Sequence, residues 1–146
     1  ELLKYLQIDR DWIMAKGFTV LELLIVLIII GILTIIAVPL LMEAKLSAQA
    51  TAALTTLRNM SSAQAAYFCR NGNKYFGDLS DLSATGFLDA RFAPGTVTFD
   101  GYVFTAEVDV SRFTFWARPQ AESNPVFYVN DDNTLHYENG EPVSGD

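Results

Sequence analysis

Glu22 is the residue in this chain whose position most needs a chemical explanation. It stands just before Leu23–Met42, a run of twenty residues in which no side chain is charged and only Thr34 is polar. A carboxylate at the start of such a helix is costly in lipid, and the run itself offers no cation to neutralise it. Two explanations stand: the carboxylate lies at the interface, where the positive end of a helix favours anions, or it pairs with a cation from another subunit.

The residues before the apolar run supply a candidate for that cation. Lys16 and Gly17 precede the run, and no small-residue cleavage site follows it, so any processing is expected on the cytoplasmic side of the run. If the chain is cut after Gly17, the new α-amino group of Phe18 becomes a cation that can pair with Glu22 of another copy. We favour this second explanation of Glu22.

The apolar run is also long enough to cross a membrane, because a helix spans the hydrocarbon core with about 20 residues. The chain has 146 residues, which leaves room for one domain beyond the run. That domain is acidic: from Ser47 onward there are six Lys or Arg against twelve Asp or Glu, within a net charge of -7. Direct binding of nucleic acid is therefore not expected. Cys69 is the only cysteine, which excludes an intrachain disulfide.

The stretch KGFTVLELLIVLIIIGIL, which begins at Lys16, closely resembles the type III signal sequence of type IV pilins and type II secretion pseudopilins. The resemblance covers roughly residues 16–42. It implies that a prepilin peptidase cuts between Gly17 and Phe18 and then methylates the new N-terminus at Phe18. Residues 1–17 are then a leader peptide, within which Met14 is a candidate initiator.

Other positions in the same stretch match the family as well. Thr19 matches the usual second residue of the mature chain, and Glu22 falls on the fifth-position glutamate that pairs with a neighbour's N-terminal amine. Phe18, Thr19 and Glu22 are thereby implied in assembly. Gly31 and Pro39 match frequent helix-breaking positions, and a proline inside a helix costs about 3 kcal/mol. We expect an intact, gently kinked helix in a single chain and local unwinding in a filament.

After Pro39 the apolar pattern becomes that of an amphipathic helix. Apolar or buried-type residues recur at spacings of three and four. They are Leu46, Ala50, Ala53, Leu57, Met60, Gln64 and Tyr67. The pattern predicts that the helix continues to about Arg70 and stops at Asn71–Gly72.

The C-terminal half predicts an antiparallel sheet of roughly four strands packed on the amphipathic half of the helix, with the apolar half protruding. This is an α+β fold. Strands are predicted at 101–108, 112–118, 126–129 and 134–138, with 96–99 as an addition to the first. Their Val, Phe, Leu and Trp side chains are expected to face the helix. The connector at 72–95 predicts a short helix from Asp78 to near Gly86, capped by Ser80.

The predicted organisation is therefore a leader at 1–17, a membrane or filament-core helix at 18–42 and a globular head at 43–146. Within the head we expect the second half of the helix at 43–71, the connector at 72–95, the sheet at 96–138 and a tail at 139–146.

The sequence shows no pattern typical of an enzyme. Gly-rich phosphate loops, nucleophile elbows and metal-ligand pairs are missing from it. His136, the only histidine, falls in a predicted edge strand, and we interpret it as a surface or half-buried strand residue. Asp131 and Asp132 are a weak calcium candidate, because carboxylates cluster there, although turn chemistry explains the same residues. We expect no catalytic residues and no cofactor.

The resemblance implies a structural subunit, most like a major pilin of the type IVa kind, that polymerises through its N-terminal helix. Its partners are then copies of itself, a prepilin peptidase, the pilus assembly machinery and, before assembly, the inner membrane. Such filaments serve adhesion, motility or surface colonisation. A type II secretion major pseudopilin is the alternative within the family. A membrane-tethered domain that never polymerises is the alternative from another class.

Overall fold

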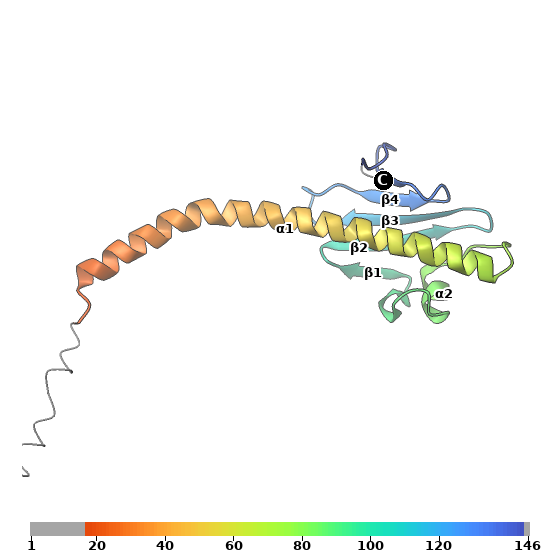
Figure 1. The fold of residues 1–146 in the computed structure, drawn as a ribbon, viewed down its shortest axis with the longest axis horizontal. Coiled ribbons are helices and arrows are strands. Elements are labelled where there is room, and N and C mark those ends of the chain that lie inside the picture. Colours follow the sequence, from red (N-terminus) through yellow and green to blue (C-terminus); the bar gives the residue numbers. More distant parts are fainter. Residues whose placement is uncertain (1–16, 145–146) are drawn as a thin grey trace, which may run out of the picture. The chain divides into compact units, whose positions relative to one another are not determined.

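The computed structural model describes residues 17–144, so the predicted leader lies outside the described residues except for Gly17. The chain divides into two units, one ending at Leu41 and one beginning at Met42, which we call the head. In chain order the elements are helix α1 (Val20–Arg70), helix α2 (Leu79–Ala84), the 3-10 helix η3 (Ala90–Phe92) and strands β1 (Thr96–Phe99), β2 (Tyr102–Val108), β3 (Phe113–Pro119), β4 (Phe127–Asn130) and β5 (Leu135–Tyr137) (Figure 1).

Helix α1 ends at Arg70, as predicted. Gly72 and Asn73 follow with φ angles of 68° and 59°, and the Asn73 amide donates to the Phe68 carbonyl at 3.0 Å. Left-handed residues and backward hydrogen bonds of this kind end helices because they satisfy the last free carbonyls. The helix runs unbroken through Gly31 and Pro39, which is what we expected of a single chain. Local unwinding in a filament stays a prediction.

The sheet has five antiparallel strands in the order β1-β2-β3-β4-β5, so each strand pairs with its neighbour in sequence. Residues 96–99 form a strand of their own instead of extending β2. The reason is the turn between them, where Phe99 pairs with Tyr102 across Asp100 and Gly101. Both turn residues have positive φ, 50° and 77°, and an Asp-Gly pair in that conformation closes a two-residue hairpin.

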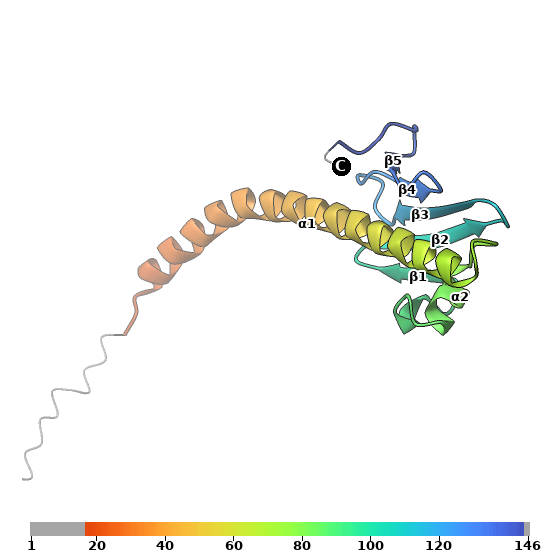
Figure 2. The same cartoon turned by 45° about the vertical axis from the view of Figure 1, so that its right-hand side comes forward.

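In the head, the second half of α1 lies along one face of the sheet (Figures 1 and 2). The predicted helical face is buried there: Ala53, Leu57, Met60, Gln64 and Tyr67. The sheet contributes alternate residues to the same core, namely Tyr102, Phe104, Phe113, Phe115, Ala117, Phe127, Val129 and Leu135. The α+β prediction is thus confirmed.

Trp116 does not lie in that core, and our expectation for it was wrong. It follows Phe115 in β3, and successive side chains of a strand point to opposite faces. Phe115 is fully buried against the helix, whereas Trp116 is half-buried on the other face. There it contacts Tyr128, with 4.9 Å between ring centroids, and lies under the Arg118 guanidinium at 4.7 Å.

The connector is tied to the helix by a buried amide. Gln64 Nε2 donates to the Gly77 carbonyl at 2.9 Å, and the Gly77 amide approaches Gln64 Oε1 at 3.4 Å. A Cβ atom on residue 77 would lie 2.7 Å from Cε1 of Tyr67, a contact too short to hold. The buried polar groups of both residues are therefore satisfied only because residue 77 is a glycine.

Asp78, not Ser80, caps helix α2. Its Oδ1 accepts hydrogen bonds from the Asp81 amide at 2.8 Å and from the Ser80 hydroxyl at 2.6 Å, while Asp81 Oδ2 faces the Asp78 amide at 3.3 Å. Ser80 lies one residue inside the helix, so it cannot occupy the capping position. The Ser80 hydroxyl and the Asp81 amide both hold the pKa of Asp78 below its ordinary value of 3.8.

We expect Asp78→Ala to lower the free energy of unfolding by about 1 kcal/mol, the usual cost of losing such a cap. Asp78→Asn keeps the cap but cannot ionise. Because the pKa of Asp78 is lowered in the folded state, its ionisation stabilises the fold above pH 3.8 and the contribution is lost as the pH falls through the lowered pKa. Urea unfolding of the three proteins at pH 7 and pH 3 measures both effects, and equal pH dependence in wild type and Asp78→Asn would contradict this assignment.

Candidate assembly site

Thr19 and Glu22 form a reciprocal cap at the start of α1. Glu22 Oε2 accepts the Thr19 amide and the Thr19 hydroxyl, both at 2.9 Å. The Thr19 hydroxyl oxygen in turn accepts the Glu22 amide at 3.2 Å. This is the capping-box arrangement, in which a threonine and a glutamate three residues later satisfy each other's free amides.

The cap explains why a carboxylate is tolerated at this position. It binds two donors at the positive end of a helix, which is the first of the two explanations. The cap is also compatible with the second explanation, pairing with a cation of another subunit, because the cap occupies only Oε2 of Glu22. Within residues 17–144, Oε1 of Glu22 has no hydrogen-bond partner and remains able to accept one from a cation.

Phe18, next to this cap, is 78% exposed. Phe18, Thr19 and Glu22 therefore lie at one end of α1, and their role in assembly stays a prediction. Gly17 is also exposed, and among the described residues no atom beyond its chain neighbours lies within 4 Å of its Cβ position. Gly17 and Phe18 are thus both accessible in the described part of the chain.

The apolar run is exposed along its whole length. Its large side chains are between 43% and 76% exposed, and every residue from 17 to 41 is exposed. The hydroxyl of Thr34 donates to the Ile30 carbonyl at 2.7 Å, so the run's one polar side chain is satisfied by its own backbone. The helix is long and apolar enough to span a membrane.

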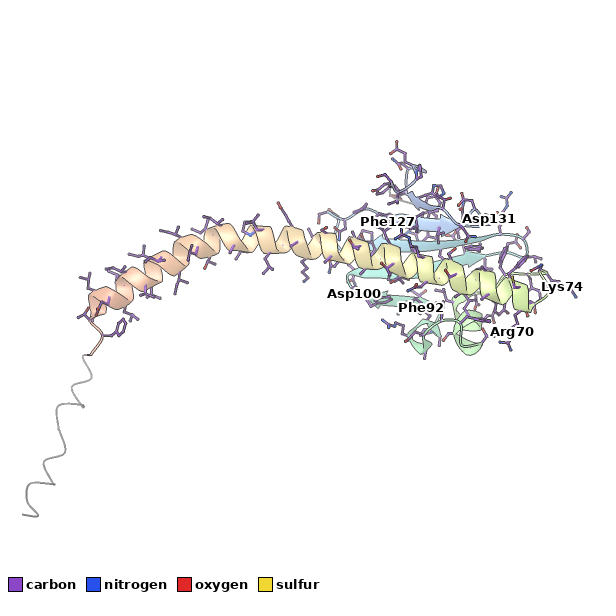
Figure 3. All side chains as sticks on the ribbon, in the orientation of Figure 1. Arg70, Lys74, Phe92, Asp100, Phe127 and Asp131 are labelled. Carbon is purple, nitrogen blue, oxygen red and sulfur yellow. The ribbon has the colours of Figure 1, made fainter. Side chains whose placement is uncertain are left out.

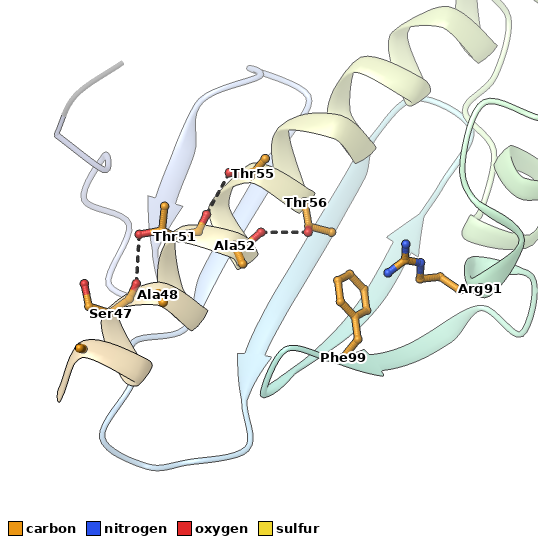
Figure 4. A pocket seen from close by; sticks show the side chains of 9 residues that line it. Ser47, Ala48, Thr51, Ala52, Thr55, Thr56, Arg91 and Phe99 are labelled. Atoms are coloured by element: carbon orange, nitrogen blue, oxygen red, sulfur yellow. Dashed lines mark hydrogen bonds between the residues drawn. The ribbon is translucent and has the colours of Figure 1, made fainter. Parts of the chain in front are cut away.

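The head adds a groove that the sequence did not reveal. Its volume is about 840 Å³, and it lies between α1 and the β1 flank (Figure 4). Small residues of α1 form one wall: Ala44, Ser47, Ala48, Thr51, Ala52, Thr55 and Thr56. Phe99 and Arg91 form the other.

The threonines of this groove turn their hydroxyls inward. Thr51, Thr55 and Thr56 donate to the carbonyls four residues earlier, at 3.0, 3.0 and 2.9 Å (Figure 4). Such back-bonding uses each hydroxyl within the backbone of its own helix. A sequence count of hydroxyl residues therefore makes this helix face look more polar than it is.

Among the residues that the structure describes, Arg91 is the only charged one that lines the groove. Its Nε lies 3.2 Å from Asp89 Oδ1, and its guanidinium lies 4.8 Å from the centre of the Phe99 ring. The backbone amide of Arg91, followed by its side chain, holds the pKa of Asp89 below its ordinary value. The groove is thus lined by small and aromatic groups with a single, neutralised cation at its edge.

The calcium candidate is accounted for by turn chemistry. Asp132 Oδ1 accepts the Thr134 amide at 2.7 Å, and Oδ2 lies 3.0 Å from His136 Nε2. Burial acts to raise the pKa of Asp132, but the Thr134 amide and the His136 ring together hold it below the ordinary value. Asp131 is exposed beside it (Figure 3), and within residues 17–144 no three His, Cys, Asp or Glu side chains gather as metal ligands would.

His136 lies in the edge strand β5, as predicted, and is half-buried. Its ring stacks on Tyr128 with centroids 5.0 Å apart and planes at 19°. Nδ1 faces the Gly140 carbonyl at 3.3 Å, so both ring nitrogens contact groups of the fold. We interpret His136 as a residue that holds the 130–140 hairpin together.

Comparison with protein-family models, with curated proteins and with solved structures finds no match to this chain.

Proposed function

We propose that this chain is the structural subunit of an extracellular filament, of the type IV pilin kind and most like a type IVa major pilin. One observation carries the proposal: the apolar run in the first half of α1, uncharged and exposed along its length, follows an accessible Gly-Phe bond and a carboxylate whose Oε1 has no hydrogen-bond partner within residues 17–144. Such a helix is stable only when lipid or other apolar helices cover it.

In this proposal lipid covers the helix first and copies of the chain cover it later. The precursor spans the inner membrane once, with its N-terminus inside. A prepilin peptidase removes the leader after Gly17 and methylates Phe18. The assembly machinery then moves the helix into a bundle of copies, where Glu22 pairs with the N-terminal amine of a neighbour. Their mutual attraction offsets the free-energy cost of burying both charges.

The groove of the head supports the same proposal. An apolar helix on one copy can be covered by an apolar groove on another. When such contacts are made head to tail, they lead to rings or to open helical filaments. The chain offers such a pair in its apolar run and in the groove along Ala44–Thr56. Neither surface suggests catalysis, so we propose no enzymatic activity.

The test is to express the chain with a prepilin peptidase and pilus assembly machinery, shear the cells and image the released fibres. Long external fibres made mainly of this protein are the expected result. Short fibres confined to the periplasm would favour the pseudopilin alternative. If no polymer forms, the chain is a membrane-tethered domain and the proposal is wrong.

Mass spectrometry of the sheared fibres gives a separate prediction. The subunit should begin at Phe18 with a methylated amine, because that residue is exposed beside the scissile bond. The leader should be missing from essentially every subunit in the fibre. A mature N-terminus at any other residue would count against the family resemblance.

A further inference from the structure

A second hollow in the head lies where α1 enters it. Its volume is about 410 Å³, and both α1 and the loop after β3 line it. Lys45, Gln49, Gln120 and Ser123 contribute polar groups, and Met42, Leu46 and Ala121 contribute apolar ones. We call it the entry pocket.

The entry pocket is held open by contacts of the fold. Gln49 packs beneath the β1–β2 turn, so closely that a Cβ on Gly101 would lie 2.5 Å from its Nε2. The Gln120 amide donates to the Gly101 carbonyl at 2.8 Å. Asn124 Nδ2 donates to the Leu46 carbonyl at 3.4 Å. The loop 120–124 is therefore fixed to both the turn and the helix, so the pocket exists before any ligand arrives.

The chemistry of the lining fits an amphipathic anion. Lys45 supplies a cation, and the amides of Gln49 and Gln120 with the Ser123 hydroxyl supply further donors, a set suited to phosphate oxygens. The apolar side chains beside them suit the glycerol and first acyl carbons of a lipid. In the described part of the chain no carboxylate lines the pocket, although Glu43 and Glu122 follow Met42 and Ala121 directly in the sequence.

The position of Lys45 along α1 matches the headgroup layer, and Gln49 lies just beyond that layer. The uncharged run ends at Met42, and Lys45 follows three residues later in the same unbroken helix, a rise of about 4.5 Å at 1.5 Å per residue. Gln49 is roughly 10 Å beyond Met42 by the same measure. Phospholipid headgroups occupy about 5–8 Å on each side of the hydrocarbon core.

We propose that the entry pocket binds the phosphate-bearing headgroup of a membrane phospholipid while the chain is in the membrane. The inference rests on the membrane-inserted precursor of the proposed function and goes beyond it, because it assigns a ligand to the head. The positive charge of Lys45 complements the phosphodiester. The bound lipid leaves when the subunit enters a filament, where no headgroup layer surrounds it.

The test uses the full chain, extracted from membranes in mild detergent without any assembly machinery, and native mass spectrometry. Wild type should retain one phospholipid, and Lys45→Gln should lower the retained fraction about tenfold, the loss expected from one charge-assisted hydrogen bond. Lys74→Gln is the matched control, since Lys74 lies at the other end of the head from the Asp100 turn (Figure 3) and should retain lipid like wild type. Ala121→Trp fills the pocket and should lower retention without removing a charge.

If wild type and all three variants retain lipid equally, the retained lipid is bound non-specifically around the helix and not in the entry pocket. That result would overturn the proposal. Retention of a second copy of the chain in place of lipid would overturn it too. Filament formation is measured separately, so lipid binding can fail while fibres form. Conversely, if the chain binds lipid through Lys45 but never polymerises, the assignment of the entry pocket stands and the proposed function is wrong.

Discussion

Glu22→Val should leave membrane insertion intact and reduce fibre yield by at least about a hundredfold. The reason is that a neighbour's N-terminal amine, buried in an apolar core without a counter-charge, strongly disfavours association. Valine makes the helix more apolar, so insertion cannot suffer. What is lost is the acceptor for a neighbour's N-terminal amine, which leaves that amine buried without a partner. Quantitative blots of sheared fibres against membrane fractions measure the two quantities together.

The capping box gives Glu22 a second role, and a second variant separates the two roles. Glu22→Gln can still accept the Thr19 amide and hydroxyl through its side-chain oxygen, because glutamine serves as well as glutamate in a capping box. It has no charge to offer an amine. If pairing is the essential role, Gln and Val should reduce assembly alike, and Thr19→Ala, which removes the cap and keeps the charge, should assemble much better than either.

A different order of fibre yields among these variants would assign another role to Glu22. Normal fibres from Glu22→Gln, with a defect in both Glu22→Val and Thr19→Ala, would assign Glu22 to helix capping alone. The pilin resemblance could survive that result, but the charge-pairing step could not. Glu43→Gln is the control for a general effect of lost acidity, because Glu43 is exposed just beyond the apolar run.

These residues also show how far the sequence alone could lead. The apolar run and the position of Glu22 are local features, and spacing along one helix is enough to place Thr19 beside Glu22. The end of α1 was predictable for the same reason, because Asn71–Gly72 stops a helix by local chemistry. The four predicted strands fall within one residue of their predicted bounds because alternation and turn residues are likewise local. Residues 96–99, predicted as an addition to the first, form a strand of their own.

The features that sequence reasoning missed depend on contacts across the chain or on hydrogen positions. Ser80 and Asp78 are both good capping residues, and only the backbone geometry at Asp78 decides between them. The groove needs Phe99 and Arg91 to face α1 from some forty residues away. The hydroxyls of the groove threonines are satisfied because each donates to its own helix, which composition cannot show.

Trp116 is the plainest failure of the sequence-based prediction, and its reason is the two-residue period of a strand. In the sequence-based prediction, tryptophan stands with the Val, Phe and Leu side chains that are expected to face the helix. In β3, however, Phe113, Phe115 and Ala117 share one face, and Trp116 must take the other. A shift of pairing by one residue would reverse every side chain of the strand.

Phe115→Ala should therefore cost more stability than Trp116→Ala, although tryptophan is the larger side chain. Phe115 is fully buried and packs on Phe113 with ring centroids 5.1 Å apart, so its removal leaves a cavity between sheet and helix. Such truncations cost about 3–5 kcal/mol. Trp116→Ala removes one cross-strand ring pair and one cation–π contact, together about 1–2 kcal/mol.

An unsatisfied hydrogen-bond donor reduces the loss of unfolding free energy that we expect from Trp116→Ala. Its indole Nε1 is buried and has no hydrogen-bond partner within residues 17–144, so the native protein already bears the penalty of an unsatisfied donor. Removing the ring removes that penalty and offsets part of the lost contacts. Urea unfolding of the full chain in micelles, followed by circular dichroism, gives both values, with Thr114→Ala as the control on the outer face. A larger loss for Trp116→Ala than for Phe115→Ala would mean that the faces of β3 are reversed, and with them the packing of the whole sheet on α1.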